Sequence, residues 1–473
     1  MEDSRAPSYR TTAIIVASAL FMEQLDGTVL ATALPTMART FSVSPLHMST
    51  ALTSYLLALA MFIPASGFMA DRHGAKKTFR LAILVFTLGS IACGQATSLP
   101  FLVAARFLQG AGGAMMVPVG RLVLLRSVAK EDMVSAMSWF MVPALLGPVV
   151  GPPLGGWIVT FASWRWIFLL NVPIGILGMA LVTRYIPDFK EPPAGPFDAR
   201  GFVLSSLALS CLVFGLEVGA RREGVPLAWT FGILAFGAAM AVAYLVHEKR
   251  TEHPLLDLSL LRIPTFGISV AGGALTRITG GALPFLLPLM LQVGFGVSAA
   301  RSGLITFSTA VGSLLMKLTA PPILRRFGFR DTLVWNALIA SSLLAVCAAF
   351  RPGWPLFLVN ALLLVGGFFQ SLQYTALNTV AYADVPQSRM SLATSLYSTC
   401  QQLMLSMGIC VATLVLSTST RLLGHSVPRL SDFSVAFLAV TAISLLASPV
   451  CAILPRDAGA AMTGHLPADP APE

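Results

Sequence analysis

Two acidic residues and one basic residue lie where the chain is otherwise apolar. Glu23 and Asp26 fall within the stretch FMEQLDGTVLATALP, and their separation of three residues directs both carboxylates to one face of a helix. Like charges this close in a low-dielectric setting cannot both ionise cheaply, so at least one acid is expected to hold a proton near neutral pH. The alternative is that one acid only pairs with Arg106 and so joins two helices.

Arg106 opens a later apolar stretch and is followed by the glycine-rich run QGAGGA. Because an arginine keeps its proton in proteins, it would act as a fixed charge that competes with protons for a carboxylate. The pattern indicates either a proton-coupling element made of Asp26, Glu23 and Arg106, or a purely structural ion pair.

The elements that carry these residues follow from composition. Of 473 residues, 56% are hydrophobic and 11% are charged, less than half the roughly 25% of soluble proteins. Fourteen apolar segments are long enough to cross a bilayer core about 30 Å thick. Their approximate limits are 12–36, 49–70, 80–98, 101–121, 133–160, 164–184, 201–219, 226–247, 264–293, 300–321, 332–350, 355–381, 391–417 and 432–455. This predicts an all-α membrane protein with fourteen transmembrane helices.

Basic residues orient these spans, because short cytoplasmic loops collect Lys and Arg. With a cytoplasmic N-terminus, the inner segments hold 20 of the 31 basic residues and the outer loops hold 8. Both termini are therefore expected in the cytoplasm. The net charge of +10 does not indicate nucleic-acid binding, since the basic residues lie in short loops and not on one solvated face.

Two longer cytoplasmic connections divide the spans into six, two and six. The predicted parts are an N-terminal six-helix bundle (1–184), two inserted helices with their linkers (185–263), a C-terminal six-helix bundle (264–455) and a disordered cytoplasmic tail (456–473). The sequence from Gly67 to Gly74 is weakly repeated as 321–328, and each copy follows the second helix of its six. Duplicated six-helix units with a site between them are typical of secondary transporters.

Further residues break the apolar pattern. Glycines recur every four residues in the fifth span, where they favour either a packing seam or a moving hinge; with the neighbouring residues this set is Gly147, Pro148, Gly151, Pro152, Gly155 and Gly156. Arg277 lies midway along its span, Lys317 can reach the inner interface, and Glu217 can reach the outer one. A polar stripe suitable for a wet cavity comprises Gln370, Gln373, Tyr374 and Asn378, and Gln109 is assigned to the same substrate cavity with Arg277.

Several of these stretches resemble the fourteen-span drug:proton antiporter branch of the major facilitator superfamily, over nearly the whole chain. The matching stretches are Leu25 to Val29 with Ala33-Leu34-Pro35, Arg106 with Gln109-Gly110, Gly147-Pro148 to Gly155-Gly156, and Trp164 to Gly175. The resemblance implies two six-helix bundles around a central cavity, with two extra helices between them. It also implies a gating loop made of Gly67, Asp71, Arg72, Gly74, Lys76 and Lys77, although Ala75 replaces the usual Arg.

The expected function is therefore proton-coupled export of small molecules by alternating access in the inner (cytoplasmic) membrane. The partners are a small-molecule substrate, protons and the lipid bilayer, and a monomer is expected. No enzyme activity, cofactor or metal is expected: a P-loop motif is absent, and all six cysteines lie in apolar stretches. Two alternatives stay open. One is export of an endogenous anion, such as an organic acid or metal chelate, attracted by Arg277 and Lys317; the other is a membrane sensor or channel.

Overall fold

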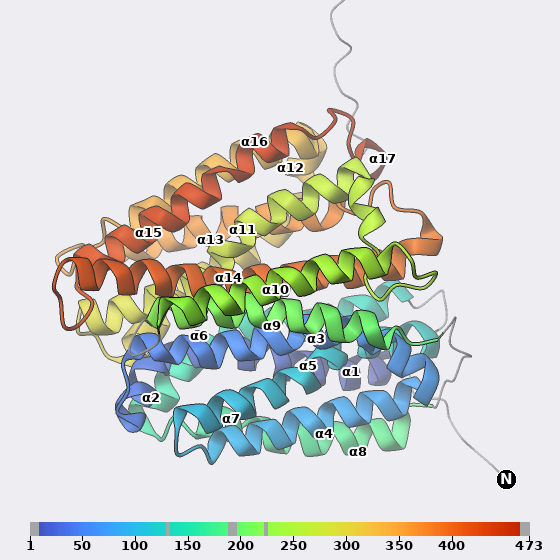
Figure 1. The fold of residues 1–473 in the computed structure, drawn as a ribbon, viewed down its shortest axis with the longest axis horizontal. Coiled ribbons are helices and arrows are strands. Elements are labelled where there is room, and N and C mark those ends of the chain that lie inside the picture. The colour runs from blue at the N-terminus through green and yellow to red at the C-terminus, as the bar shows by residue number, and fades with distance from the viewer. Residues whose placement is uncertain (1–8, 129–132, 188–195, 222–225, 464–473) are drawn as a thin grey trace, which may run out of the picture. The chain divides into compact units, whose positions relative to one another are not determined.

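The computed structural model describes residues 9–128, 133–187, 196–221 and 226–463 (Figure 1). Within these ranges the regular secondary structure is entirely helical, so the all-α prediction is confirmed. By internal contacts the chain forms two compact units. Unit 1 comprises residues 1–218, 223–255 and 297–304, and unit 2 comprises residues 219–222, 256–296 and 305–473. The two inserted helices thus group with the first bundle.

Unit 1 is built from ten α-helices and two short 3-10 turns in its described part, coloured blue to green in Figure 1. These are α1 (Tyr9–Val29), η1 (Leu30–Thr32), α2 (Leu34–Phe41), η2 (Pro45–Met48), α3 (Ser49–His73), α4 (Ala75–Gly94), α5 (Leu99–Ser127), α6 (Met133–Phe161), α7 (Trp166–Leu169), α8 (Asn171–Tyr185), α9 (Ala199–Arg221) and α10 (Leu227–Glu248).

Unit 2 holds most of the remaining helices of the described chain. These are η4 (Leu258–Arg262), α11 (Pro264–Leu289), the π-helical turn η5 (Met290–Gly294), α12 (Ala299–Cys347), α13 (Leu356–Val380), η6 (Gln387–Arg389), α14 (Met390–Leu422), α15 (Leu430–Leu445), α16 (Ala447–Ala452) and α17 (Ala460–Thr463). The first residues of α12, up to Leu304, group with unit 1.

Each of the fourteen predicted spans has a helical counterpart. Among the described residues, twelve helices are long and apolar enough to cross a membrane, and a shorter apolar helix covers Leu146–Phe161 of α6. The long α12 contains two predicted spans, because non-helical backbone at Gly328 divides it. Predicted and observed ends differ by a few residues where prolines restart a helix, as at Pro35 near the start of α2.

Two glycines mark equivalent chain breaks in the two halves. Gly74 separates α3 from α4 with φ +93°, and Gly328 breaks α12 with φ +70° and ψ 175°. Both conformations are ones that side chains with a Cβ rarely adopt. The weak repeat predicted from sequence places these same two glycines at its end, so the backbone supports an internal duplication.

The start of the segment expected to be a disordered tail packs on unit 2. Ala458 is buried in a cluster with Phe329, Leu333 and Val380, and α17 follows it. An alanine-rich sequence can do this because small apolar side chains fit against a helix surface at little entropic cost. Residues 464–473 lie outside the described part of the chain.

The linker that enters unit 2 is fixed by an ion pair. Asp257 accepts hydrogen bonds from Ser259 and pairs with Arg389 before α14. Burial alone would raise the pKa of Asp257, but the hydrogen bonds from Ser259 and the charge of Arg389 outweigh it and lower that pKa. The linker is therefore attached most firmly when Asp257 is ionised.

We expect Gly74→Ala and Gly328→Ala each to lower the free energy of unfolding by about 1–3 kcal/mol, because alanine must adopt a strained backbone at both positions. Thermal unfolding of the purified protein measures the effect. Gly353→Ala is the matched control, since a Cβ there meets nothing within 4 Å and its φ is ordinary. Equal melting temperatures for the three variants would contradict the strain argument.

Candidate functional site

The Asp26 carboxylate on α1 is buried and bonded on both oxygens. Its Oδ2 accepts a hydrogen bond from Arg106 Nη1 on α5, with which it forms an ion pair. Its Oδ1 accepts from Gln109 Nε2 at 2.8 Å and from Asn171 Nδ2 on α8 at 3.1 Å. Asp26 is 1% exposed and Arg106 is fully buried. Three donors around one carboxylate stabilise its ionised form.

Arg106 is held by α3 as well as by Asp26. Its Nε donates to the backbone oxygen of Ala51 at 3.3 Å, and its guanidinium carbon lies 4.2 Å from the centre of the Tyr55 ring. Phe168 lies on another side, with its ring centre 5.8 Å away. An aromatic face attracts a desolvated cation, so these contacts help to fix the position of the buried guanidinium.

Ser90 on α4 completes the hydrogen-bond network. Gln109 Nε2 lies 2.6 Å from Ser90 Oγ, and Asn171 Nδ2 lies 3.2 Å from the same oxygen. We call Asp26, Arg106, Gln109, Asn171 and Ser90 the Asp26 cluster. Its members come from the four helices α1, α4, α5 and α8, so the cluster requires most of unit 1 to be folded.

Three residues predicted from the sequence to belong to functional sites meet in this cluster. The structure brings Asp26 and Arg106 together, and it places Gln109, which was predicted to line the substrate cavity, beside them. Gln109 follows Arg106 by three residues on α5, so both side chains leave the same helix face. Sequence reasoning gave no role to Ser90 and Asn171. The available signal was their polarity within apolar spans.

Glu23 lies one turn before Asp26 on α1 and is 7% exposed. Its Oε2 is buried and has no hydrogen-bond partner in the described part of the chain. A buried carboxylate without a partner is costly to ionise, whereas its neutral form is tolerated. The two acids of α1 therefore differ: both oxygens of Asp26 accept hydrogen bonds, whereas Glu23 has a buried oxygen without a donor.

The glycines of α6 form the surface on which α1 packs. A Cβ added at Gly147 would lie 2.8 Å from Gln24 Cβ, and one at Gly151 would lie 2.1 Å from Thr28 Oγ1. At Gly155 the added Cβ would lie 2.4 Å from the backbone oxygen of Val29. Bare backbone thus allows α6 to approach the helix that carries Glu23 and Asp26.

The residues of the predicted gating loop surround the break between α3 and α4. Gly74 is buried, Asp71 and Lys76 are half-buried, and Arg72 and Lys77 are exposed. A Cβ at Gly67 would meet nothing within 4 Å, so packing alone does not require that glycine. The guanidinium of Arg72 lies over the ring of Phe68, with 5.9 Å between the guanidinium carbon and the ring centre.

Unit 2 contains a second polar group, around Arg277 on α11. Its guanidinium carbon lies 4.1 Å from the centre of the Tyr374 ring, and its Nη2 donates to Asn378 Oδ1 at 3.2 Å. Gln370 Nε2 donates to the Tyr374 hydroxyl at 3.1 Å. No carboxylate pairs with Arg277 among the described residues. Lys317 is exposed and donates to Thr375 at 2.8 Å.

A small cavity of about 40 Å³ lies within unit 2. Its polar lining includes Thr276, Thr279, Gln370, Gln373 and Tyr374. Gln373 is 1% exposed, and its amide is engaged by Asn336 and by the backbone oxygen of Leu333. Of the predicted stripe, Gln370 and Tyr374 therefore offer polar groups to this cavity, while Gln373 also joins α13 to α12.

Other chemistry finds little support in the described residues. The six cysteines are free and buried or half-buried. No group of three metal-ligating side chains occurs in the part of the chain that the structure describes.

Comparisons with known proteins place this chain in one family. The model of the Major Facilitator Superfamily matches residues 16–409 and 269–465. A relative from Pectobacterium atrosepticum, named "Putative multidrug resistance protein MdtD", is 39% identical over 402 residues, which cover 85% of this chain and 86% of the relative. A relative of the same name from Klebsiella pneumoniae is 37% identical over 453 residues, covering 94% of each chain.

Solved structures of transporters share the fold. The D-xylose-proton symporter superposes with a TM-score of 0.66 at 15% identity, covering 95% of this chain and 98% of that one. A bacterial homologue of the human lysosomal transporter Spinster gives 0.65 at 15% identity, with 95% and 97% covered. At such low identity the likeness concerns the fold alone.

We expect Arg106→Gln to lower the free energy of unfolding by about 3–5 kcal/mol, because it leaves the buried Asp26 carboxylate without its countercharge. Chemical unfolding of the purified protein measures the loss. The double variant Asp26→Asn with Arg106→Gln should recover part of that stability, and Arg80→Gln at an exposed position of α4 should change it little. Additive losses in the double variant would show that the pair does not interact energetically.

Proposed function

We propose that the chain works by alternating access and exports small molecules in exchange for protons that move inward. It belongs to the major facilitator superfamily. It is a multi-pass membrane transporter and not an enzyme. The relatives named as multidrug resistance proteins favour lipophilic drugs or other toxic compounds as substrates. The observation that carries the proposal is the buried ion pair between Asp26 and Arg106.

This ion pair has two charge states, and only one of them leaves both charges compensated. While Asp26 is ionised, it neutralises the buried guanidinium of Arg106. When a proton binds Asp26, the carboxyl becomes neutral and Arg106 keeps an uncompensated charge. The unit then gains by rearranging around Arg106, for example by admitting water or an anionic group. Protonation is thereby linked to a change of packing.

Glu23 supplies a second proton acceptor beside the first. Its buried, unpartnered oxygen favours a neutral carboxyl while Asp26 is ionised. If the packing change opens α1 to water, Glu23 can ionise and release its proton. In this scheme the two acids hold protons in different states of the transport cycle, and Arg106 acts as the fixed charge between them.

The contact between α1 and α6 is suited to movement. Glycines 147, 151 and 155 present backbone to α1, so no α6 side chain separates the two helices at these three positions. Small-residue surfaces allow close helices to slide or tilt without rotamer clashes. We assign the hinge role to this contact and the gating role to the loop around Gly74.

The sidedness follows from the distribution of basic residues. The inner segments of the predicted topology hold 20 basic residues and the outer loops 8, which places both termini in the cytoplasm by the positive-inside rule. The proposed location is the inner (cytoplasmic) membrane, and the proposed working form is a monomer.

A second candidate function rests on the charges of unit 2. Arg277 and Lys317 lack a carboxylate partner in the described residues, and Arg277 is backed by an aromatic ring. An unpaired cation in a membrane protein marks an ion or substrate site by default. This arrangement favours an anionic substrate, such as an organic acid or a metal chelate, exported by the same proton-coupled cycle.

Asp26→Asn should abolish substrate accumulation driven by a proton gradient, because an amide cannot carry the proton. Exchange of labelled for unlabelled substrate without a gradient should persist, since it needs only the change of access. Both are measured in proteoliposomes, and counterflow also separates a carrier from a sensor or a channel. If Asp26→Asn still moves substrate against its gradient at the normal rate, the coupling assignment is wrong.

Arg277→Ala should discriminate between the two substrate classes. If the substrate is an anion, removing the guanidinium should weaken its binding by about tenfold or more, as expected for loss of a charge-assisted hydrogen bond. Binding of lipophilic cations should be unchanged or stronger. Thermal-shift titration with small organic acids and with lipophilic cations measures both, and equal effects on the two classes would count against the anion site.

A further inference from the structure

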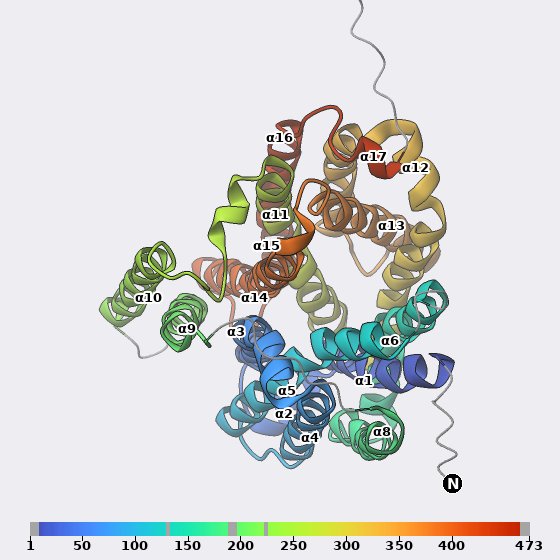
Figure 2. The ribbon, with the colours of Figure 1, turned by 90° about the vertical axis from the view of Figure 1, so that its right-hand side faces the viewer.

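The first inserted helix, α9, runs beside α3 within unit 1. Figure 2 shows α9 between α10 and α3. Midway along, Ser210 Oγ lies 3.3 Å from Met61 Sδ. Near the start of α9, the centres of the Phe202 and Phe62 rings lie 5.7 Å apart. The inserted helix therefore touches α3 over several turns.

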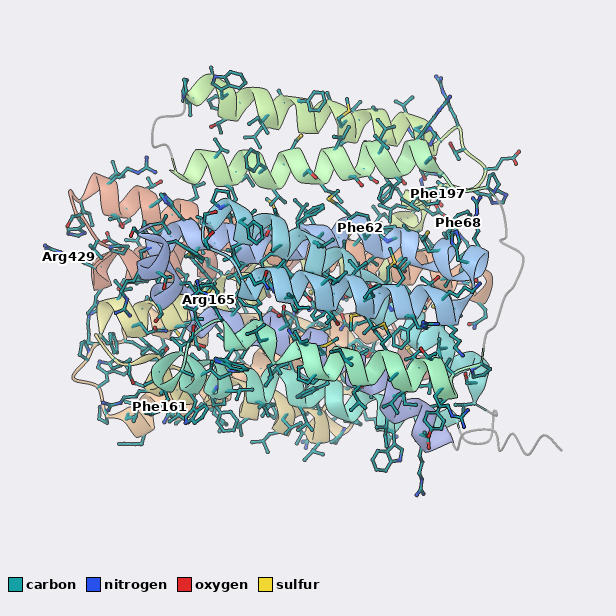
Figure 3. All side chains as sticks on the ribbon, turned by 90° about the horizontal axis from the view of Figure 1, so that it is seen from below. Phe62, Phe68, Phe161, Arg165, Phe197 and Arg429 are labelled. Atoms are coloured by element: carbon teal, nitrogen blue, oxygen red, sulfur yellow. The ribbon has the colours of Figure 1, made fainter. Side chains whose placement is uncertain are left out.

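An aromatic group fixes the end of α9 that follows the linker. Phe197, two residues before α9, packs between Phe68 of α3 and Phe202, with ring centres 4.9 and 5.8 Å away. Figure 3 shows Phe62, Phe68 and Phe197 gathered at this end of unit 1. This contact joins the linker to the helix that leads into the loop around Gly74.

The opposite end of α9 carries a buried carboxylate. Glu217 is 2% exposed. Its Oε1 accepts from Thr53 Oγ1 at 3.0 Å, and its Oε2 accepts from Ser49 Oγ at 3.2 Å. The sequence alone suggested that Glu217 could reach the outer interface, but the structure turns it inward to α3. A buried carboxyl is costly unless it is hydrogen-bonded. Removing Glu217 should therefore loosen the attachment of α3 to α9.

The opposite side of this same stretch of α3 holds Arg106. Ser49 and Thr53 alternate with Ala51 and Tyr55, and a two-residue step turns a helix by about 200°, so the two pairs face opposite ways. Ala51 accepts the Arg106 Nε bond, and Tyr55 stacks on its guanidinium. The first two turns of α3 thus lie between Glu217 and Arg106.

On the side that faces Arg106, α3 packs closely against α5. A Cβ at Gly110 of α5 would lie 2.5 Å from the backbone oxygen of Tyr55. Because α3 and α5 meet through backbone atoms here, a shift of α3 must displace the groups that bind Arg106. The hydrogen bonds of Glu217 oppose such a shift from the other side.

We propose that Glu217 is a positioning residue: by bonding Ser49 and Thr53 it holds α3 in the place where Ala51 and Tyr55 bind Arg106, and so makes the inserted helices part of the coupling device. The functional part of this inference rests on the proposed role of the Asp26 cluster. The structural part does not, and it can be tested without transport.

Cys93 is the reporter for that test. It is fully buried and its Sγ lies 3.6 Å from Gln109 Oε1, within the environment of the Asp26 cluster. In a full-length chain with the other five cysteines replaced by alanine, labelling by N-ethylmaleimide measures how often this region opens. Glu217→Leu should increase the labelling rate about tenfold, because it removes both hydrogen bonds that hold α3.

Glu217→Gln should stay within about twofold of the parent, because its amide can bond both hydroxyls. Phe214→Leu is the matched control: Phe214 lies on the same helix and is 56% exposed, so this variant should label at the parent rate. If Glu217→Leu folds poorly, the double variant Ser49→Ala with Thr53→Val carries the same expectation from the α3 side. Unchanged Cys93 labelling in Glu217→Leu or in that double variant, or an equal increase in Phe214→Leu, would overturn the proposal.

Transport separates this inference from the proposed function. In proteoliposomes, Glu217→Leu should lose proton-driven accumulation of substrate and Glu217→Gln should restore it. If Cys93 labelling rises while proton-driven transport is unaffected, α3 is positioned by Glu217 as inferred, but the Asp26 cluster does not couple protons. If labelling does not rise, the positioning role fails whatever transport does.

Discussion

The cost of a charge in a medium that cannot solvate it governs unit 1. Asp26 and Arg106 are both fully withdrawn from solvent, so each depends on the other and on neutral dipoles to complete its bonding. Gln109, Asn171 and Ser90 supply those dipoles from three further positions. The pair therefore dictates how four helices are rotated about their axes, because each must present a polar group to one point.

The four helices can bring their polar side chains to one point because glycines let their backbones lie close together. A Cβ at Gly89 of α4 would lie 2.7 Å from the backbone of Gln109, and the glycines of α6 admit α1 in the same way. Without a large hydrophobic drive between helices in lipid, such close contacts contribute much of the association energy. The same glycines therefore determine how near the helices around the charge site can lie.

Sequence reasoning succeeds where the bilayer itself imposes the pattern. The length of apolar runs predicts the spans, and the rarity of charge identifies Asp26 and Arg106. Sequence reasoning fails where contacts depend on how a helix is rotated about its axis. A helix that is apolar on every face does not show which face contacts a neighbouring helix. Asn171 and Glu217 illustrate this: each looks like an isolated polar residue in sequence, and only the packing of α8 and α9 shows its partner. For Gln109 the three-residue step from Arg106 already places both side chains on one helix face.

The distance along the chain between the two charges has a consequence for how the protein is made. Asp26 and Arg106 are separated by 80 residues, which a ribosome adds in roughly 4–16 s at about 5–20 residues per second. During that interval the first helix meets the lipid with no guanidinium available. A lone aspartate at mid-bilayer costs at least about 2.5 kcal/mol, so the nascent segment enters as the neutral acid or waits beside the insertion machinery. The order of synthesis thus sets a requirement on the charge of Asp26 before its partner exists.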